Sequence, residues 1–168
     1  MEMQLYALHV VPFIVIVYFA FLLFMRPPGA AILASLVGGL TMGVLNALFD
    51  LMAYYASIWH YTASGLILQL PLPFYVTPIL IFGAVVYLLI WRTWHTRGHW
   101  FAMLLLVGVP LFGFARDYFT ATTRSSYVVW DSTFPWAVNL IMWLVMFYAG
   151  YFVFRRLAPA RESEAKSA

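Results

Sequence analysis

Acidic side chains in apolar segments are the residues of this chain whose type best suits chemistry. Asp50 lies in a long apolar stretch that ends near Ser57, and Asp117 lies near the end of another such stretch. A carboxyl group in apolar surroundings is costly unless it has a partner, faces water or is protonated. A protonated carboxyl group in a dry pocket is a suitable proton donor to an alkene. Asp50 and Asp117 are therefore the candidate catalytic residues.

The stretch around Asp50 has helical spacing. Small residues come first and polar residues follow, at intervals that place them all on one face of a helix. Gly39 and Gly43 form a GxxxG pair, which lets a second helix approach closely. The stripe is predicted to pack tightly in its first half and to be polar in its second half. Its members are Ser35, Gly39, Gly43, Asn46, Asp50 and Tyr54.

Polar residues from several apolar segments are expected to cluster at one end of the molecule. They are His9, Asn46, Asp50, Arg116, Asp117 and Asn139. Two interpretations stay open: a ligand pocket and a hydrogen-bonded plug that fixes helix packing. Arg116 could pair with Asp50 across helices, whereas Asp117 is not its obvious partner, because adjacent helical residues point in different directions. Without such a partner, Asp50 would be held in its protonated form.

The elements that position these residues must lie in a membrane. Of 168 residues, 65% are hydrophobic and 9% are charged, and the mean hydropathy is +0.90. Soluble domains carry about 25% charged residues, so this chain has too few polar residues to cover a water-facing surface. Its formal charge of +3 is too small to indicate nucleic-acid binding, and it has no cysteine for disulfides or metal ligation. Gly98 separates His95 from His99, and neither a metal ion nor a cofactor is predicted.

The hydropathy pattern predicts an all-α bundle of about five transmembrane helices. Each apolar stretch approaches or reaches the length of about 20 residues that crosses the hydrocarbon core. The predicted helices cover residues 5–25, 30–57, 74–91, 99–118 and 134–154. They form a single bundle over residues 1–157, followed by a disordered cytoplasmic tail over residues 158–168.

Lysine and arginine residues predict the orientation of this bundle. With five spans, two of them fall on one side, Arg116 and Arg124. The other seven fall on the opposite side: Arg26, Arg92, Arg97, Arg155, Arg156, Arg161 and Lys166. The positive-inside rule makes the richer side cytoplasmic. We therefore expect a multi-pass protein of the cell membrane with its amino terminus outside and its carboxyl terminus inside.

Two loops that both face outward in this topology are rich in aromatic residues. They contain or adjoin Trp59, Tyr61, Tyr127, Trp130 and Trp136. Aromatic belts at the membrane interface explain such residues without a ligand. In the alternative interpretation these aromatic residues line a substrate site, together with Asn46, Tyr54, Arg116 and Asn139.

Short motifs follow one another between residues 46 and 91. They are Phe49-Asp50-Leu51, Trp59-His60-Tyr61, Gly65 and Leu70-Pro71-Leu72, with an apolar helix after them. This order resembles the lycopene cyclase domain, a membrane-embedded carotenoid cyclase of bacteria and fungi, over about a quarter of the chain. In that family a helix with Trp-Asp leads to an aromatic loop, a Gly, and Leu-Pro-Leu followed by two acids. Here Pro73-Phe74 replaces those acids.

The resemblance implies an isoprenoid- or carotenoid-type lipid as ligand and an acid-initiated, redox-neutral cyclisation without a cofactor. Asp50 matches the aspartate of the family, and Asp117 would take the corresponding part after the second aromatic loop. Aromatic side chains would shelter the carbocation. Because five helices are few to enclose a long polyene, self-association is expected. The alternative function is a non-catalytic membrane subunit or lipid-binding scaffold of a larger complex, and a transporter fits less well.

Overall fold

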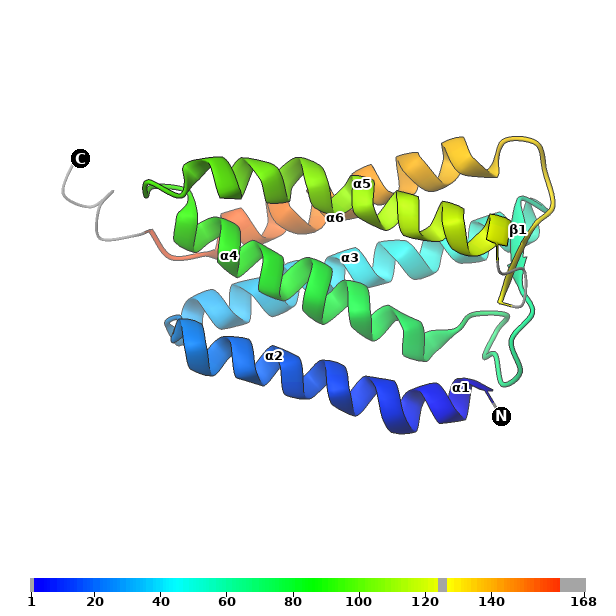
Figure 1. The fold of residues 1–168 in the computed structure, drawn as a ribbon, viewed down its shortest axis with the longest axis horizontal. Helices are drawn as coiled ribbons and strands as arrows, with labels where there is room; N and C mark the ends of the chain where they lie inside the picture. The colour runs from blue at the N-terminus through cyan, green and yellow to red at the C-terminus, as the bar shows by residue number, and fades with distance from the viewer. Residues whose placement is uncertain (1, 124–126, 161–168) are drawn as a thin grey trace.

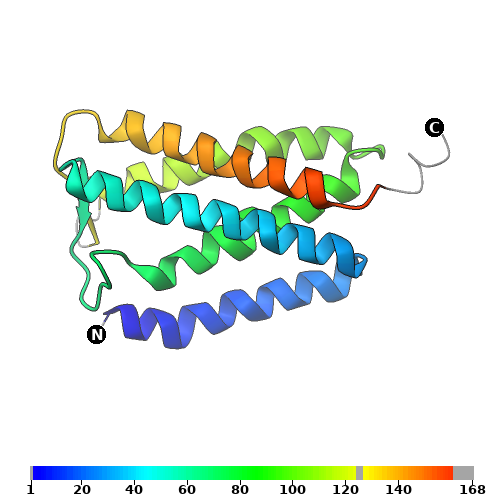
Figure 2. The same ribbon diagram turned by 180° about the vertical axis from the view of Figure 1, so that it is seen from behind.

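The computed structural model describes residues 2–123 and 127–160 of the chain. The protein is 78% helical, and within these residues five helices are long and apolar enough to cross a membrane. They lie side by side along one axis and alternate in direction. The first helix therefore begins at one end of the bundle and the last helix ends at the other (Figures 1 and 2). The predicted all-α architecture with about five spans is confirmed at this level.

The first two spans are joined by a short turn. The first is a continuous helix composed of α1 (Glu2–Leu5), the π-helical η1 (Tyr6–Val10) and α2 (Val11–Met25). Arg26 ends it in the left-handed region, with a φ of 46°. Two prolines follow, and α3 (Gly29–Tyr55) then forms the second span. Proline has no backbone N–H to continue a helix, which explains the sharp separation of α2 from α3.

The other spans are longer than the hydropathy pattern predicts. The third combines η2 (Leu72–Tyr75), the π-helical η3 (Pro78–Val85) and α4 (Val86–Thr93). The fourth and fifth are α5 (His99–Thr123) and α6 (Pro135–Leu157). Hydropathy marks where the apolar side chains end, whereas backbone hydrogen bonds continue into the polar ends of these helices. The predicted disorder of the tail concerns residues 158–168, of which 161–168 lie outside the described part.

α3 lies at the centre of the bundle, between η3 and α6. A Cβ atom added to Gly39 would lie 2.2 Å from the carbonyl oxygen of Ile79, and one added to Gly83 would lie 2.6 Å from the Cα atom of Gly39. The predicted close approach of a second helix to the Gly39/Gly43 face is therefore confirmed. A further close contact joins Gly38 to Gly150 of α6, and the spacing of the stripe gave no indication of it.

The two aromatic loops pair with each other at one end of the bundle. β1 (Trp59–Tyr61) and β2 (Val128–Trp130) form an antiparallel ladder in which Trp59 lies opposite Trp130. The Nδ1 atom of His60 lies 2.7 Å from a carboxylate oxygen of Asp131 beside this ladder. We call residues 59–61 and 128–130 the strand cap. Their pairing was not predicted, because each run is short and the two are far apart in the sequence.

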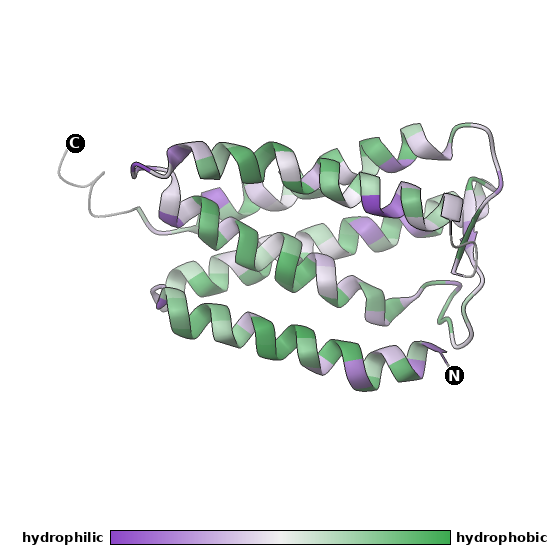
Figure 3. Ribbon diagram, in the orientation of Figure 1, coloured by the Kyte–Doolittle hydropathy of each residue, from purple (hydrophilic) through white to green (hydrophobic). Residues whose placement is uncertain are grey.

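Hydrophobic residues dominate the helices, and strongly hydrophilic residues lie mostly toward the two ends of the bundle (Figure 3). The acidic residues of the described chain all lie toward the strand-cap end: Glu2, Asp50, Asp117 and Asp131. The end where α2 and α6 finish instead carries the arginines Arg26, Arg92, Arg97, Arg155 and Arg156. We call it the basic end.

The orientation of the bundle remains a prediction that reporter fusions can test. A reporter fused after Ala168 is expected to be cytoplasmic, and a reporter inserted at residues 124–126 is expected to be external, because the positive-inside rule places the basic end inside. The measurement is the activity of a paired phosphatase and fluorescent-protein reporter at each site. The reverse pattern would place the strand cap in the cytoplasm.

Candidate functional site

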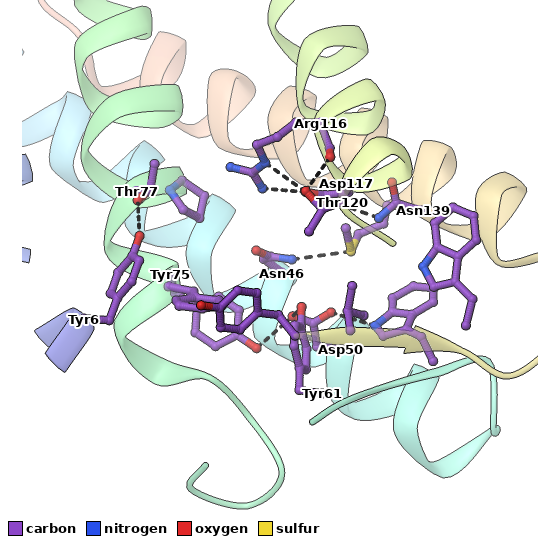
Figure 4. Close-up of a pocket in the computed structure, with 17 residues that line it drawn as sticks. Tyr6, Asn46, Asp50, Tyr61, Tyr75, Thr77, Arg116, Asp117, Thr120 and Asn139 are labelled. Atoms are coloured by element: carbon purple, nitrogen blue, oxygen red, sulfur yellow. Dashed lines mark hydrogen bonds and ion pairs between the residues drawn. The ribbon is translucent and has the colours of Figure 1, made fainter. Parts of the chain in front are cut away.

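A cavity of about 270 Å³ lies beneath the strand cap. Its walls come from every span of the described bundle and from both strands (Figure 4). Polar walls come from the middle and end of the helices: Asn46, Asp50, Thr77, Arg116, Asp117, Thr120 and Asn139. Aromatic walls come mainly from the connections: Tyr6, Trp59, Tyr61, Phe74, Tyr75, Tyr127 and Trp130. The cavity therefore combines two carboxyl groups and other polar side chains with an equal number of aromatic residues.

Asp50 is held by neutral hydrogen-bond donors. Its side chain is on α3 and the residue is only 3% exposed. Oδ1 accepts a hydrogen bond from Nε1 of Trp59 at 3.0 Å, and Oδ2 accepts from the hydroxyls of Tyr61 at 3.1 Å and Tyr75 at 2.8 Å. A carboxylate has about four acceptor positions. The position left over is on Oδ1, and it can carry the acidic proton or accept from a ligand.

The chain reaches this arrangement by turning back sharply after α3. Ser57 has a φ of 51°, in the left-handed region, and β1 then carries Trp59 and Tyr61 back over the end of the helix. Pairing of β1 with β2 holds the side chains of Trp59 and Tyr61 in the wall of the cavity. Tyr75 arrives separately, in the short helix η2 that opens the third span. The donors to Asp50 thus come from two segments on either side of one loop.

Tyr61 lies in the strand cap, outside the spans, and remains a donor at ordinary pH. Burial raises the pKa of its hydroxyl well above the ordinary value, and the negative charge of Asp50 raises it further. A neutral phenol can donate a hydrogen bond to the carboxylate, whereas a phenolate would repel it. Tyr61 therefore supports the ionised form of Asp50 without competing for its proton.

Asp117 occupies the opposite wall and has a cationic partner. Arg116 donates from Nε at 2.9 Å and from a terminal nitrogen at 2.6 Å, both to Oδ1. Oδ2 accepts from Nε1 of Trp143 at 2.7 Å and from the amide of Asn139 at 3.3 Å. The guanidinium of Arg116 also lies 5.4 Å from the ring centroid of Trp143, a distance at which a cation is attracted to an aromatic ring.

The possible ion pair between Arg116 and Asp50 is not formed. Arg116 pairs with its neighbour Asp117 instead, which the sequence analysis did not favour. Their Cα–Cβ bonds do diverge on the helix, but the long arginine side chain folds back and reaches the adjacent carboxylate. The alternative, an Asp50 without a cationic partner, is the arrangement seen.

Two buried amides complete the polar wall. Nδ2 of Asn46 contacts the sulfur of Met142 at 3.4 Å. Oδ1 of Asn139 is buried and has no hydrogen-bond partner among the described residues. A buried acceptor without a partner is costly. A ligand hydroxyl or a water molecule that donates a hydrogen bond to this oxygen would remove that cost.

Most of the predicted site residues line the cavity, and three do not. Tyr54 packs against Tyr55, with 5.4 Å between their ring centroids, and Trp136 is 47% exposed. His9 is exposed, and its Nδ1 atom lies 3.0 Å from the carbonyl oxygen of Leu5. Helical spacing placed Tyr54 on the stripe, but α3 ends at Tyr55 and its last turn extends past the cavity.

Other residues of the site were missed by the sequence analysis. Tyr75 lines the cavity, whereas Trp143 does not, and each donates to one of the carboxyl groups. No motif marks either residue. The one available signal was position: Tyr75 begins the span after Asp50, and Trp143 lies one helical turn after Asn139.

The described residues contain no group of three or more His, Asp or Glu that could hold a metal ion. His99 lies at the start of α5, with its Nδ1 atom 2.9 Å from the carbonyl oxygen of Trp94. Comparisons with protein-family models, curated proteins and solved structures gave no match to this chain. The function must therefore be inferred from the cavity.

The pairing of Arg116 can be tested with double-mutant cycles on thermal stability in detergent. Arg116→Gln combined with Asp117→Asn should show a coupling of about 0.5–1 kcal/mol, because the pair is partly exposed and screened by water. Arg116→Gln combined with Asp50→Asn should be closer to additive. A larger coupling energy to Asp50 than to Asp117 would mean that Arg116 pairs with Asp50 across the helices.

Proposed function

We propose that this chain is an integral membrane protein that binds an isoprenoid-type lipid in the cavity and isomerises it by protonating a carbon–carbon double bond. The observation that carries this proposal is the environment of Asp50, a buried carboxyl group with neutral donors beside a cavity lined by seven aromatic residues. The donors stabilise the carboxylate that remains after proton transfer. None of these three donors is a cation, so none of them would repel the carbocation.

The proposed reaction conserves atoms and electrons. The proton of Asp50 forms a C–H bond at one alkene carbon and leaves a cation on the other. A second double bond of the same molecule attacks that cation and closes a C–C bond. Loss of a proton from a carbon beside the new cation restores a double bond, so the product is an isomer of the substrate.

Asp117 is the proposed acceptor of the departing proton. It lines the same cavity and forms an ion pair with Arg116. Phe74, Tyr127 and Trp130 present aromatic rings to the cavity, and the faces of such rings attract a cation. Asp50, with neutral partners, is thus the proposed proton donor. Asp117, with a cationic partner, is the proposed proton acceptor.

The cavity suits one end of a lipid chain better than a complete long polyene. Its volume of about 270 Å³ lies just below the usual range for ligand pockets, about 300–1,000 Å³. The rest of the chain would lie along the apolar outer surface of the helices. A substrate with its reacting double bond near one terminus follows from this geometry.

The proposed reaction belongs to the class implied by the resemblance to the lycopene cyclase domain. The proposed proton donor is Asp50, and not an acid that follows the Leu-Pro-Leu motif. The two acids of the family's Leu-Pro-Leu motif are replaced by Pro73-Phe74, but the next residue, Tyr75, reaches Asp50 at 2.8 Å. In this chain the segment after Leu-Pro-Leu would therefore support the acid instead of supplying it.

Solvent isotope labelling tests the proposed function directly. The full-length protein in proteoliposomes is incubated with a set of polyene isoprenoids of different chain lengths, in H₂O and in D₂O. Acid-initiated isomerisation should give a product of unchanged mass in H₂O and of one mass unit more in D₂O, because the new C–H bond takes its hydrogen from Asp50. A product without deuterium, or a change in oxidation state, would contradict the mechanism.

A non-catalytic scaffold is the second candidate, and one observation favours it. Both carboxyl groups already have donors from the chain itself, as they would in a polar network that fixes helix packing. Such a protein would bind lipid or a partner subunit without changing it. The Asp50→Asn variant separates the two candidates.

A further inference from the structure

A second cavity lies at the basic end of the bundle, away from Asp50. Its volume is also about 270 Å³. It opens between the end of α4, the residues after it and the last turns of α6. The side chains that matter for its chemistry are Trp91, Trp94, His95, Tyr151, Phe154 and Arg155.

The electrostatic surroundings of this cavity favour an anion. Arg155 and Tyr151 both line it, while Arg92, Arg97 and Arg156 lie at the same end. The acidic residues within the described ranges 2–123 and 127–160 all lie toward the opposite end. The carboxyl end of α6 by itself disfavours an anion, so the guanidinium of Arg155 must supply the attraction.

The walls of the cavity are those of a membrane interface. Trp91, Trp94 and Tyr151 have apolar rings with one polar atom, a combination that favours the level of the lipid head groups. Nε1 of Trp91 donates to the carbonyl oxygen of Pro159 at 3.2 Å, which closes one side of the cavity. Apolar rings beside one guanidinium can accommodate the glycerol region of a lipid while the arginine binds its phosphate.

We propose that the basic-end cavity binds the phosphate group of an anionic phospholipid, with Arg155 as the residue that contacts it. A guanidinium binds phosphate through parallel hydrogen bonds, and basic pockets between transmembrane helices are suited to such head groups. The positive-inside bias explains why arginines lie at this end, but it does not require one of them to line an aromatic cavity. In the predicted orientation the site faces the cytoplasmic leaflet.

The test compares two neighbouring arginines. Arg156 lies over the ring of Phe152, 4.9 Å from its centroid, and is not among the residues that line the cavity. Arg155→Gln and Arg156→Gln therefore remove the same charge from the same helix end, and only the first alters the cavity. Native mass spectrometry of the full-length protein in detergent measures binding of dioleoyl phosphatidylglycerol, dioleoyl phosphatidylcholine and inorganic phosphate.

We expect saturable binding of phosphatidylglycerol that Arg155→Gln weakens by about 10-fold and Arg156→Gln by less than about 2-fold. Phosphatidylcholine should bind more weakly than phosphatidylglycerol. Saturable binding of inorganic phosphate with the same dependence on Arg155 would keep the phosphate site but assign it to a free anion. Equal losses in the two variants would overturn the proposal, because the attraction would then belong to the basic end as a whole. So would the absence of saturable binding while melting temperatures show that both variants are folded.

Discussion

Replacing Asp50 with Asn is expected to abolish product formation while leaving the protein folded. Asparagine has the same shape but no transferable proton, so turnover should fall by about 100-fold or more. The hydrogen-bond network can adapt to it. The amide oxygen still accepts from Trp59, and the two amide hydrogens can be donated to Tyr61 and Tyr75, because a hydroxyl both donates and accepts.

Product formation and melting temperature should be measured on the same preparations. Asp131→Asn is the matched control, since it removes a carboxylate at the same end of the bundle, beside His60 and outside the cavity wall. Full activity of Asp50→Asn would eliminate Asp50 as the acid. A large loss of stability, with no turnover even in the unaltered protein, would instead support the scaffold.

Replacing Gly39 with Ala is expected to have the largest effect on stability. The new methyl group would lie 2.2 Å from a backbone oxygen of η3, and a backbone cannot move aside as a side chain can. Overpacking of this kind costs about 1–3 kcal/mol and occasionally more. Gly43→Ala should cost less, because its new atom would meet a side-chain carbon, Cγ1 of Ile79 at 2.3 Å, and not the backbone. Thermal unfolding in detergent is the measurement.

Gly108→Ala provides the control for this comparison. Gly108 lies inside α5, and an added Cβ would meet nothing closer than a methyl group of Leu104 at 3.9 Å. Alanine is the better helix former, by about 0.5–1 kcal/mol, so this variant should be unchanged or slightly stabilised. A similar result for Gly39→Ala would mean that the helices separate easily.

The sequence predicted the parts of the structure that depend on a local period. Helical spacing identified the Gly39/Gly43 contact, and hydropathy identified the spans. Spacing also brought Asn46 and Asp50 to one face, and the cavity includes both. These features are visible in a sequence because each is determined by neighbours within one helix.

The partners of each carboxyl group could not be predicted in the same way. Trp59 is only nine positions from Asp50, yet its contact depends on a left-handed turn at Ser57 and on pairing with β2. Arg116 reaches Asp117 through the flexibility of a long side chain. The first contact depends on tertiary geometry and the second on the choice of rotamer. Neither produces a regular spacing of residues that could be recognised in the sequence.

The pairing of the two strands also imposes an order of assembly. His60 and Asp131 are 71 residues apart, and β2 is synthesised after α5. When α3 enters the membrane, Asp50 therefore has neither its cover nor the donors that β1 holds in place. The fourth span must be complete before β2 can dock, and α6 must then be inserted to bring Asn139 and Trp143 to Asp117. The cavity is thus completed late in biogenesis, and a nascent chain that stalls before α6 would leave Asp117 without two of its hydrogen-bond donors.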